Sequence, residues 1–117
     1  MPINEKSRSS GLGGMPKPCC IQMSQLGSNI KLARLRRKIR QEDMAKRVAI
    51  SVKTYRKIEN GDPSISIGLY LSALYMMGLN DEFSLIAAPG SDRIGLALEK
   101  RELPTRVRIK QNEELDF

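Results

Sequence analysis

The chain has 117 residues, which is enough for one domain with tails. Apolar residues make up 40% and charged residues 28%, the ordinary values of a globular protein, but aromatic residues reach only 4% and Trp is absent. A core built mainly from Leu, Ile, Met, Val and Ala favours helix-on-helix packing over a sheet. No apolar run suits a secretory signal, and the longest apolar stretch, residues 69–79, is too short to span a bilayer.

The net charge of +7 is concentrated in one part of the chain. Residues 31–57 contain eleven basic and two acidic residues, a net of +9, whereas residues 58–117 have a net of −4. A charge of +9 in so short a segment attracts polyanions. Nucleic acid is therefore the favoured partner. An anionic membrane surface is the weaker alternative, and a solvated basic face without a partner is the third.

Residues 1–22 are expected to form a disordered tail. The first 20 residues contain few apolar side chains and many Gly, Pro and Ser, so they cannot bury enough surface to offset their ordering entropy. Cys19 and Cys20 are adjacent and have no His or further Cys to join, which excludes a zinc site. Two thiols, no metal, no cofactor and a reducing cytoplasm are the simplest expectation.

The centre of the chain predicts three helices in succession. Apolar residues recur at helical spacing over about 24–38. A second helix, 41–48, begins with two acids that complement the positive end of the helix dipole. A third helix, 52–59, follows the N-cap residue Ser51 and ends at an Asn-Gly pair.

The remaining elements are shorter or less regular. A fourth helix is capped by Ser64 or Ser66 and ends at Gly78, and a short fifth helix covers 81–87. A further helix is expected from about 92 to 102. "TRVRIK" (105–110) alternates basic and apolar residues, so it is either a short strand that needs a partner, such as a ribbon exchanged in a dimer, or an irregular tail.

The fold class predicted from these elements is all-α: a compact five-helix bundle with a helix-turn-helix, plus a C-terminal helix and a short strand as one option for the tail. Its expected domains are a tail over 1–22, a DNA-binding domain over 23–88, and a C-terminal helix and tail over 89–117 for dimer or partner contact.

The helix 52–59 has two different faces on a helical wheel. Tyr55 and Ile58 fall on one side, which suits packing. The opposite arc carries Lys53, Thr54, Arg56 and Lys57. Such a helix fits the major groove of B-DNA, where Lys donates to guanine and the methyl group of Thr contacts thymine. The competing interpretation is that every amphipathic helix has a polar outer face.

The segment "QEDMAKRVAISVKTYRKIENG" (41–61) resembles the helix-turn-helix of the Cro/C1-type (Xre) repressor family. In that family a Gln opens the first helix, a small Ala follows four residues later, and the recognition helix ends in a pattern matched by "KIENG" (57–61). Gln41 and Ala45 occupy the first two positions here. The resemblance covers about residues 25–87 and implies a lambda repressor-like fold.

The resemblance also assigns roles to individual positions. It implies that Gln41 binds a DNA phosphate and braces the first base-reading residue, and that Asn60 binds a phosphate after the recognition helix. Arg56 is assigned to a base or to a phosphate. The candidate DNA-binding residues are Gln41, Ser51, Val52, Lys53, Thr54, Arg56, Lys57 and Asn60.

Three residues depart from the family pattern. Arg40 stands where a capping Thr or Ser is common, so the cap of the helix 41–48 should be weak. Ala49 stands where Gly is frequent, and a positive φ there would be strained. Tyr55 replaces a smaller inward aliphatic, so either the core enlarges or the hydroxyl reaches a partner.

The C-terminal half, from "GDPSISIGLYLSALYMMGL" to "DRIGLALEKRELPTRVR", resembles HipB-type antitoxins. This resemblance implies a bacterial cytoplasmic homodimer, nucleoid-associated when bound to DNA, that represses its own operon at a palindromic operator and restrains a HipA-type kinase toxin. The alternatives are a stand-alone Xre-family repressor and a protein-interaction module. An enzyme is not expected, because the chain has no His and no Gly-rich phosphate loop after a strand. RNA binding is disfavoured by the scarcity of aromatic residues.

Overall fold

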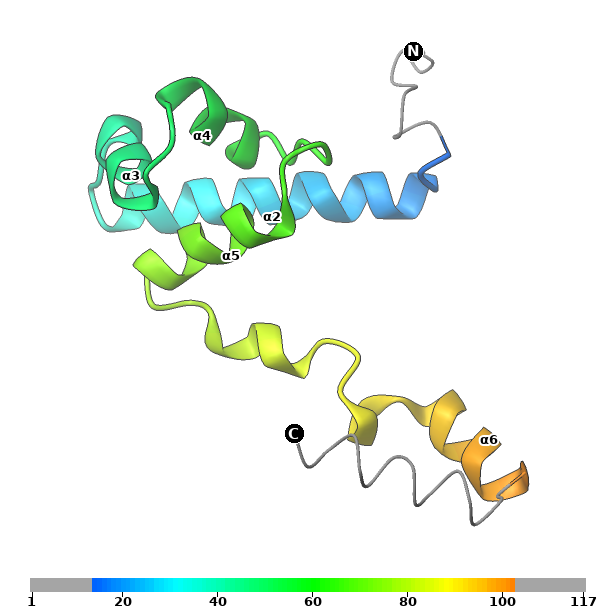
Figure 1. The fold of residues 1–117 in the computed structure, drawn as a ribbon. Coiled ribbons are helices and arrows are strands. Elements are labelled where there is room, and N and C mark those ends of the chain that lie inside the picture. The colour runs from blue at the N-terminus through cyan, green and yellow to red at the C-terminus, as the bar shows by residue number, and fades with distance from the viewer. Residues whose placement is uncertain (1–13, 103–117) are drawn as a thin grey trace. The chain divides into compact units, whose positions relative to one another are not determined.

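A computed structural model describes residues 14–102, and all regular structure in this range is helical (Figure 1). The α-helices are α2 (Lys17–Arg36), α3 (Gln41–Val48), α4 (Val52–Glu59), α5 (Ile67–Met76) and α6 (Arg93–Glu102), and two short 3-10 helices lie between α5 and α6. The predicted all-α class is confirmed. The chain divides into two compact units between Asn80 and Asp81. The segment 105–110, for which a strand was one option, lies outside the described residues.

Helix α2 begins earlier than the sequence indicated. It starts at Lys17, so residues 17–22 are helical, and the prediction that they belong to a disordered tail is wrong. Pro18 occupies the first turn, where its missing N–H leaves no intrahelical bond unmade. Met23 and Leu26 pack against the core further along. Once that part is anchored, each added helical residue gains a hydrogen bond without a new nucleation step.

Helices α3 and α4 have the bounds predicted from the sequence, and local side chains fix where α4 and α5 begin. The Ser51 hydroxyl accepts the N–H of Thr54 at 3.1 Å, and the Ser66 hydroxyl accepts the N–H of Leu69 at 3.3 Å. Ser66 is therefore the cap of α5. The Ser64 hydroxyl donates instead to Asp62 Oδ1 at 2.7 Å, within the turn before α5.

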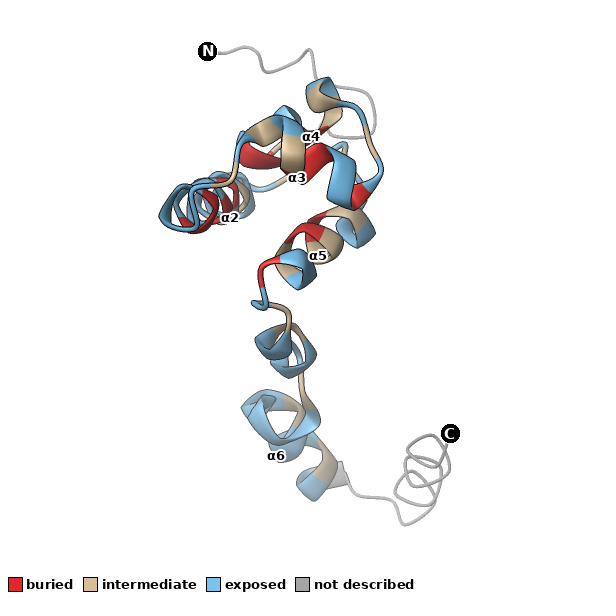
Figure 2. Cartoon of the chain, turned by 90° about the vertical axis from the view of Figure 1, so that its left-hand side faces the viewer, coloured by how far each residue is buried: buried red, intermediate tan, exposed pale blue. Residues whose placement is uncertain are grey.

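The core lies between α2, α3, α4 and α5 (Figure 2). Its buried apolar residues are Ile30, Ala33, Met44, Ala45, Val48, Tyr55, Ile58, Tyr70, Ala73 and Met77. Two of the largest are tyrosines, so the scarce aromatic residues of the chain are used inside. The Tyr70 hydroxyl donates to the Asp62 carbonyl at 2.7 Å. Burial, and then the nearby negative charge of Asp62, raise the pKa of Tyr70 to about 12.

Helix α2 passes the end of α4 at a distance that only glycine permits. A Cβ atom on Gly27 would lie 2.5 Å from the Glu59 carbonyl oxygen and 2.6 Å from the Gly61 nitrogen. Gly61 has a φ of +72°, and its own Cβ would collide with the backbone of Met23. Backbone therefore packs directly on backbone where the two helices meet, and this contact sets the position of α4 on α2.

The second unit contains α6 and two 3-10 helices, Asp81–Leu85 and Pro89–Ser91. The short helix predicted over 81–87 is a 3-10 helix, and none of its side chains is buried, so it adds nothing to the core. No residue from Asp81 to Arg101 is buried. The compact units accordingly divide at Asp81, before the domain boundary expected after residue 88.

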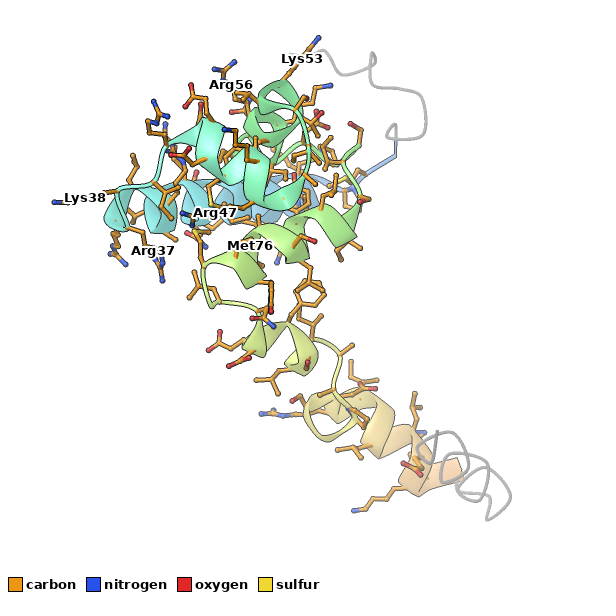
Figure 3. The ribbon with its side chains drawn as sticks, turned by 60° about the vertical axis from the view of Figure 1, so that its left-hand side comes forward. Arg37, Lys38, Arg47, Lys53, Arg56 and Met76 are labelled. Carbon is orange, nitrogen blue, oxygen red and sulfur yellow. The ribbon has the colours of Figure 1, made fainter. Side chains whose placement is uncertain are left out.

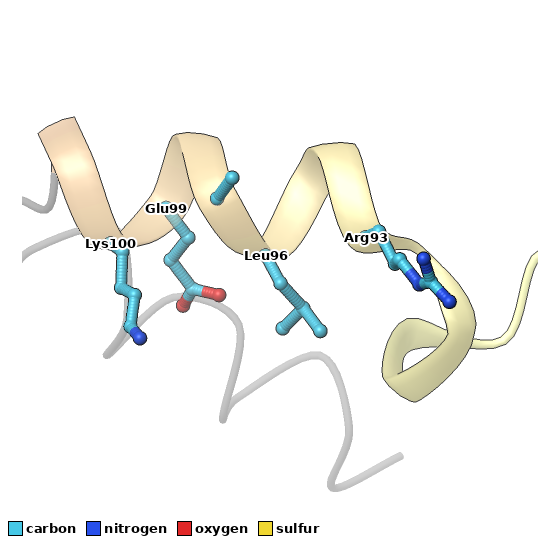
Figure 4. A pocket seen from close by; sticks show the side chains of 5 residues that line it. Arg93, Leu96, Glu99 and Lys100 are labelled. Atoms are coloured by element: carbon cyan, nitrogen blue, oxygen red, sulfur yellow. The ribbon is translucent and has the colours of Figure 1, made fainter.

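Helix α6 starts at a side-chain cap, because Asp92 Oδ1 accepts the N–H of Gly95 at 2.9 Å. It exposes the apolar side chains of Ile94, Leu96 and Leu98. A pocket lies along the helix (Figure 4), lined by Arg93, Leu96, Ala97, Glu99 and Lys100.

Candidate nucleic-acid interface

The turn between α3 and α4 sets the angle between these two helices. Ala49 has a φ of +66°, as predicted for this turn position. A left-handed conformation costs a non-glycine residue roughly 1–2 kcal/mol. The next N–H, that of Ile50, bonds to the Ala45 carbonyl at 2.9 Å and closes the turn. Arg40 gives α3 no side-chain cap, which also agrees with the prediction.

The two faces of α4 are divided as the helical wheel predicts. Tyr55, Ile58 and Glu59 are buried. Lys53, Arg56 and Lys57 are exposed, and Figure 3 shows Lys53 and Arg56 projecting away from the ribbon. Thr54 is half-buried, and so is Val52, which packs partly against the core. The outer face of α4 thus presents three cations beside a short half-buried polar and apolar edge.

A buried carboxylate holds three helices together behind this face. Glu59 accepts two hydrogen bonds from Arg34 of α2: Nε lies 2.6 Å from Oε2, and Nη2 lies 3.2 Å from Oε1. The Tyr55 hydroxyl donates to Oε2 at 2.6 Å, and Gln41 Nε2 of α3 donates to Oε1 at 2.9 Å. The remaining Arg34 nitrogen, Nη1, bonds to the Ile39 carbonyl at 2.9 Å. Each buried charge is therefore paired and hydrogen-bonded, as low-dielectric surroundings require.

The pKa shifts in this cluster follow from its contacts. Burial alone raises the pKa of Glu59, but the hydrogen bonds from Arg34, Tyr55 and Gln41 outweigh it and hold that pKa below its ordinary value. The bond to Glu59 raises the pKa of Arg34. Burial, then the bond to Glu59, raises the pKa of the Tyr55 hydroxyl. At neutral pH the cluster contains one carboxylate, one guanidinium and one neutral phenol.

The sequence left open how Tyr55 fits its inward position, and the structure answers this: the hydroxyl reaches a partner, Glu59. The pairing of Glu59 with Arg34 was not predicted. The available signal was the position of both charged residues among inward-facing neighbours, Arg34 beside Ala33 on α2 and Glu59 beside Ile58 on α4.

Gln41 and Arg56 are brought together by the packing of α3 on α4. Arg56 Nε donates to Gln41 Oε1 at 3.1 Å, and the other end of the same amide bonds to Glu59. Gln41 is half-buried, and both ends of its side chain have protein partners.

Two further candidate residues have local structural contacts. The Ser51 hydroxyl caps α4 and also donates to Thr54 Oγ1 at 3.0 Å, so its described bonds are within the turn. Asn60 is exposed at the end of α4, where its N–H bonds to the carbonyls of Arg56 and Lys57. Asn60 also lines a pocket, together with Cys20 and neighbouring residues of α2 and of the loop after α4.

The positive charge extends beyond α4 to the turn between α2 and α3. Figure 3 shows Arg37 and Lys38 at this turn and Arg47 on α3. All three are exposed, as are Arg36 and Arg40. These cations add to the positive potential of the domain, which would draw a polyanion toward it and raise its association rate.

Substitution of the N-cap residue Ser51 tests how much its hydroxyl contributes to stability. We expect Ser51→Ala to lower the free energy of unfolding by about 1 kcal/mol, because one helix N–H loses its acceptor. Ser51→Asn, which can still cap, should retain most of that stability. Chemical denaturation followed by circular dichroism measures both. Equal stability of Ser51→Ala and the wild type would show that the hydroxyl does not act as a cap.

The fold and this face together define a helix-turn-helix domain. A family model described as helix-turn-helix matches residues 30–70, which include α3, α4, the last two turns of α2 and the start of α5. Residues 30–70 are thus similar to a helix-turn-helix, a motif found in DNA-binding transcription regulators. No curated protein and no solved structure matches the chain. Among residues 14–102, no helix is both long and apolar enough to cross a membrane.

Proposed function

We propose that the protein is a sequence-specific, double-stranded DNA-binding regulator that places α4 in the major groove. The observation that carries the proposal is the contrast between the two faces of α4. Its inner face is fixed by the buried Glu59 cluster, while Lys53, Arg56 and Lys57 stand exposed on its outer face. A rigid helix with exposed cations at its surface is the geometry that direct readout of base edges needs.

Within this arrangement, Val52, Lys53, Thr54 and Lys57 are the residues proposed to face bases. Lysines donate to guanine O6 and N7, and the apolar atoms of Val52 and Thr54 contact a thymine methyl group. Asn60, at the exposed end of α4, is proposed to contact a phosphate. Phosphate contacts set the register of the protein on the duplex but do not read its sequence.

We further propose that the protein acts as a homodimer that represses its own operon at a palindromic operator. An eight-residue recognition helix reads only a few base pairs, and a dimer adds the contacts of two half-sites about one helical turn apart. The exposed apolar side chains of α6, such as Ile94 and Leu98, supply surface that a second subunit can bury.

The proposal predicts the behaviour of Lys57→Ala. Loss of a base contact should weaken binding to the preferred duplex by about 1–3 kcal/mol and relax the preference at one base pair, with a smaller effect on random DNA. Fluorescence-anisotropy titrations with both duplexes measure this. Lys31→Ala removes the same charge from an exposed position on α2 and serves as the control. If both variants lowered the affinity for both duplexes equally, Lys57 would contribute charge only.

A second role is proposed for the C-terminal unit, that of antitoxin to a HipA-type kinase toxin. It is supported by the absence of any buried residue between Asp81 and Arg101, which leaves the apolar side chains of α6 accessible to a partner. The test is co-purification with the product of the adjacent gene, using Ile94→Asp as the interface variant. Retention by the wild type but not by the variant supports the role. Without a kinase partner, the protein would be a stand-alone repressor.

A further inference from the structure

An exposed arginine on α4 is connected to the buried core through a single side chain. Arg56 Nε lies 3.1 Å from Gln41 Oε1, and Gln41 Nε2 lies 2.9 Å from Glu59 Oε1. The Glu59 side chain is only 3% exposed and is itself fixed by Arg34. The chain of contacts therefore runs from a rigid buried ion pair to a guanidinium at the surface.

The chemistry of the three groups permits only one orientation of the Gln41 amide. The Glu59 carboxylate accepts and does not donate, so the amide must present its NH2 group to it. The Arg56 guanidinium donates and does not accept, so the amide must present its oxygen there. Both requirements are met at once, and the alternative orientation would lose both bonds. Gln41 is thus held from both ends, and it fixes Arg56 in turn.

The bond through Nε leaves one edge of the Arg56 guanidinium for another partner. Its Nη1 and Nη2 atoms form a planar pair of donors that matches two oxygens of a phosphate. On a helical wheel Arg56 stands about 100° from Lys57 and nearer to the Glu59 side of α4. It lies at the flank of the outer face, and a flanking side chain meets the wall of the groove, where the phosphates are, before its floor.

We propose that Arg56 binds a DNA backbone phosphate and that Gln41 is the positioning residue that orients it, instead of a direct phosphate contact. This inference rests on the proposed DNA-binding function and assigns a role to two of its residues. It explains why an amide that opens α3 is not free at the surface: its bonds to Glu59 and Arg56 hold the guanidinium ready before DNA arrives, so less side-chain entropy is lost on binding.

A double-mutant cycle tests the proposal. It uses the full chain and two duplexes of about 25 base pairs, long enough for two half-sites one helical turn apart. One duplex has the preferred sequence and the other a random sequence. Arg56→Ala should weaken binding to both duplexes alike and reduce the slope of log affinity against log salt by about 1. Gln41→Ala should lower the affinity for both duplexes by about tenfold, because a charge-assisted hydrogen bond no longer orients the donor. In the Arg56→Ala background, Gln41→Ala should change affinity by less than about twofold.

Two further variants separate positioning from general destabilisation. Gln41→Met keeps the length of the side chain but makes neither bond, so it should match Gln41→Ala in affinity. Arg56→Lys keeps the charge, so it should restore the salt slope that Arg56→Ala loses. The DNA affinity of Arg56→Lys should, however, no longer depend on Gln41. Circular dichroism at the binding temperature verifies that each variant is folded, and an unfolded fraction is corrected for in its measured affinity.

The opposite outcomes are distinct. An equal loss from Gln41→Ala in the Arg56 and Arg56→Ala backgrounds would show that Gln41 contacts DNA itself, and it would overturn the positioning role. Failure of the wild type to prefer any duplex over random DNA would instead overturn sequence-specific regulation. The coupling between Gln41 and Arg56 would remain measurable on random DNA, because phosphate contacts do not depend on sequence.

Discussion

Glu59→Gln is expected to lower the free energy of unfolding by about 3–5 kcal/mol, because removing one partner of a buried ion pair leaves the other charge uncompensated. The Arg34 side chain of α2 is only 8% exposed, and it pairs with Glu59 of α4. Gln keeps the shape of Glu, so the loss reports on charge and not on volume. Urea denaturation of the wild type and the variant measures the difference. Glu42→Gln, an exposed acid on α3, is the matched control and should cost far less.

The same residue makes the stability depend on pH in a defined direction. The folded protein holds the pKa of Glu59 below its ordinary value of 4.5, so the folded state binds this proton less readily than the unfolded state. Its contribution is fully present above that ordinary value and is lost as the pH falls through the folded pKa. Between neutral pH and pH 3, the wild type should therefore lose more stability than Glu59→Gln. Equal losses in the two proteins would show that Glu59 is not the carboxylate responsible.

Gly27→Ala is expected to destabilise the domain by about 1–3 kcal/mol, even though Ala is the better helix former by about 1 kcal/mol. The added methyl would stand 2.5 Å from the Glu59 carbonyl oxygen, and backbone atoms cannot rotate aside as a side chain can. The two helices would have to separate, which would weaken the contacts around Ile58 and stretch the Arg34–Glu59 pair.

Gly68→Ala provides the control for this prediction. Gly68 is exposed on α5, and its nearest neighbour to an added Cβ would be the Ser66 hydroxyl at 3.8 Å. The substitution should therefore be neutral or slightly stabilising, since it has room and gains helix propensity. Thermal unfolding of the two variants separates them. A melting temperature of Gly27→Ala equal to or above that of Gly68→Ala would contradict the close packing of α2 on α4.

The parts of the fold that depend on local chemistry could be predicted from the sequence. The bounds of α3 and α4 follow from amphipathic spacing, from the Ser51 cap and from the Asn-Gly stop, all of which act within a few residues. The positive φ of Ala49 was expected from the resemblance, because Gly is frequent at this turn position in the family. The inward position of Tyr55 followed from the helical wheel.

The parts that depend on distant contacts could not be predicted. Arg34 and Glu59 are 25 residues apart, and no periodicity within one helix shows that their side chains meet. The early start of α2 at Lys17 depends on the anchoring of the helix further along, which composition alone underestimates. The role of Gln41 between Glu59 and Arg56 appears only when α3 and α4 are packed together.

Selection of bound sequences from a pool of random DNA duplexes tests whether the outer face of α4 reads DNA. For the full chain, we expect enrichment of an inverted repeat whose half-sites lie about one helical turn apart. For the variant with Lys53→Ala and Lys57→Ala, that repeat should be lost while weak, salt-sensitive binding to all duplexes remains. Recovery of no enriched sequence by the wild type, or of the same sequence by the variant, would contradict base readout by α4.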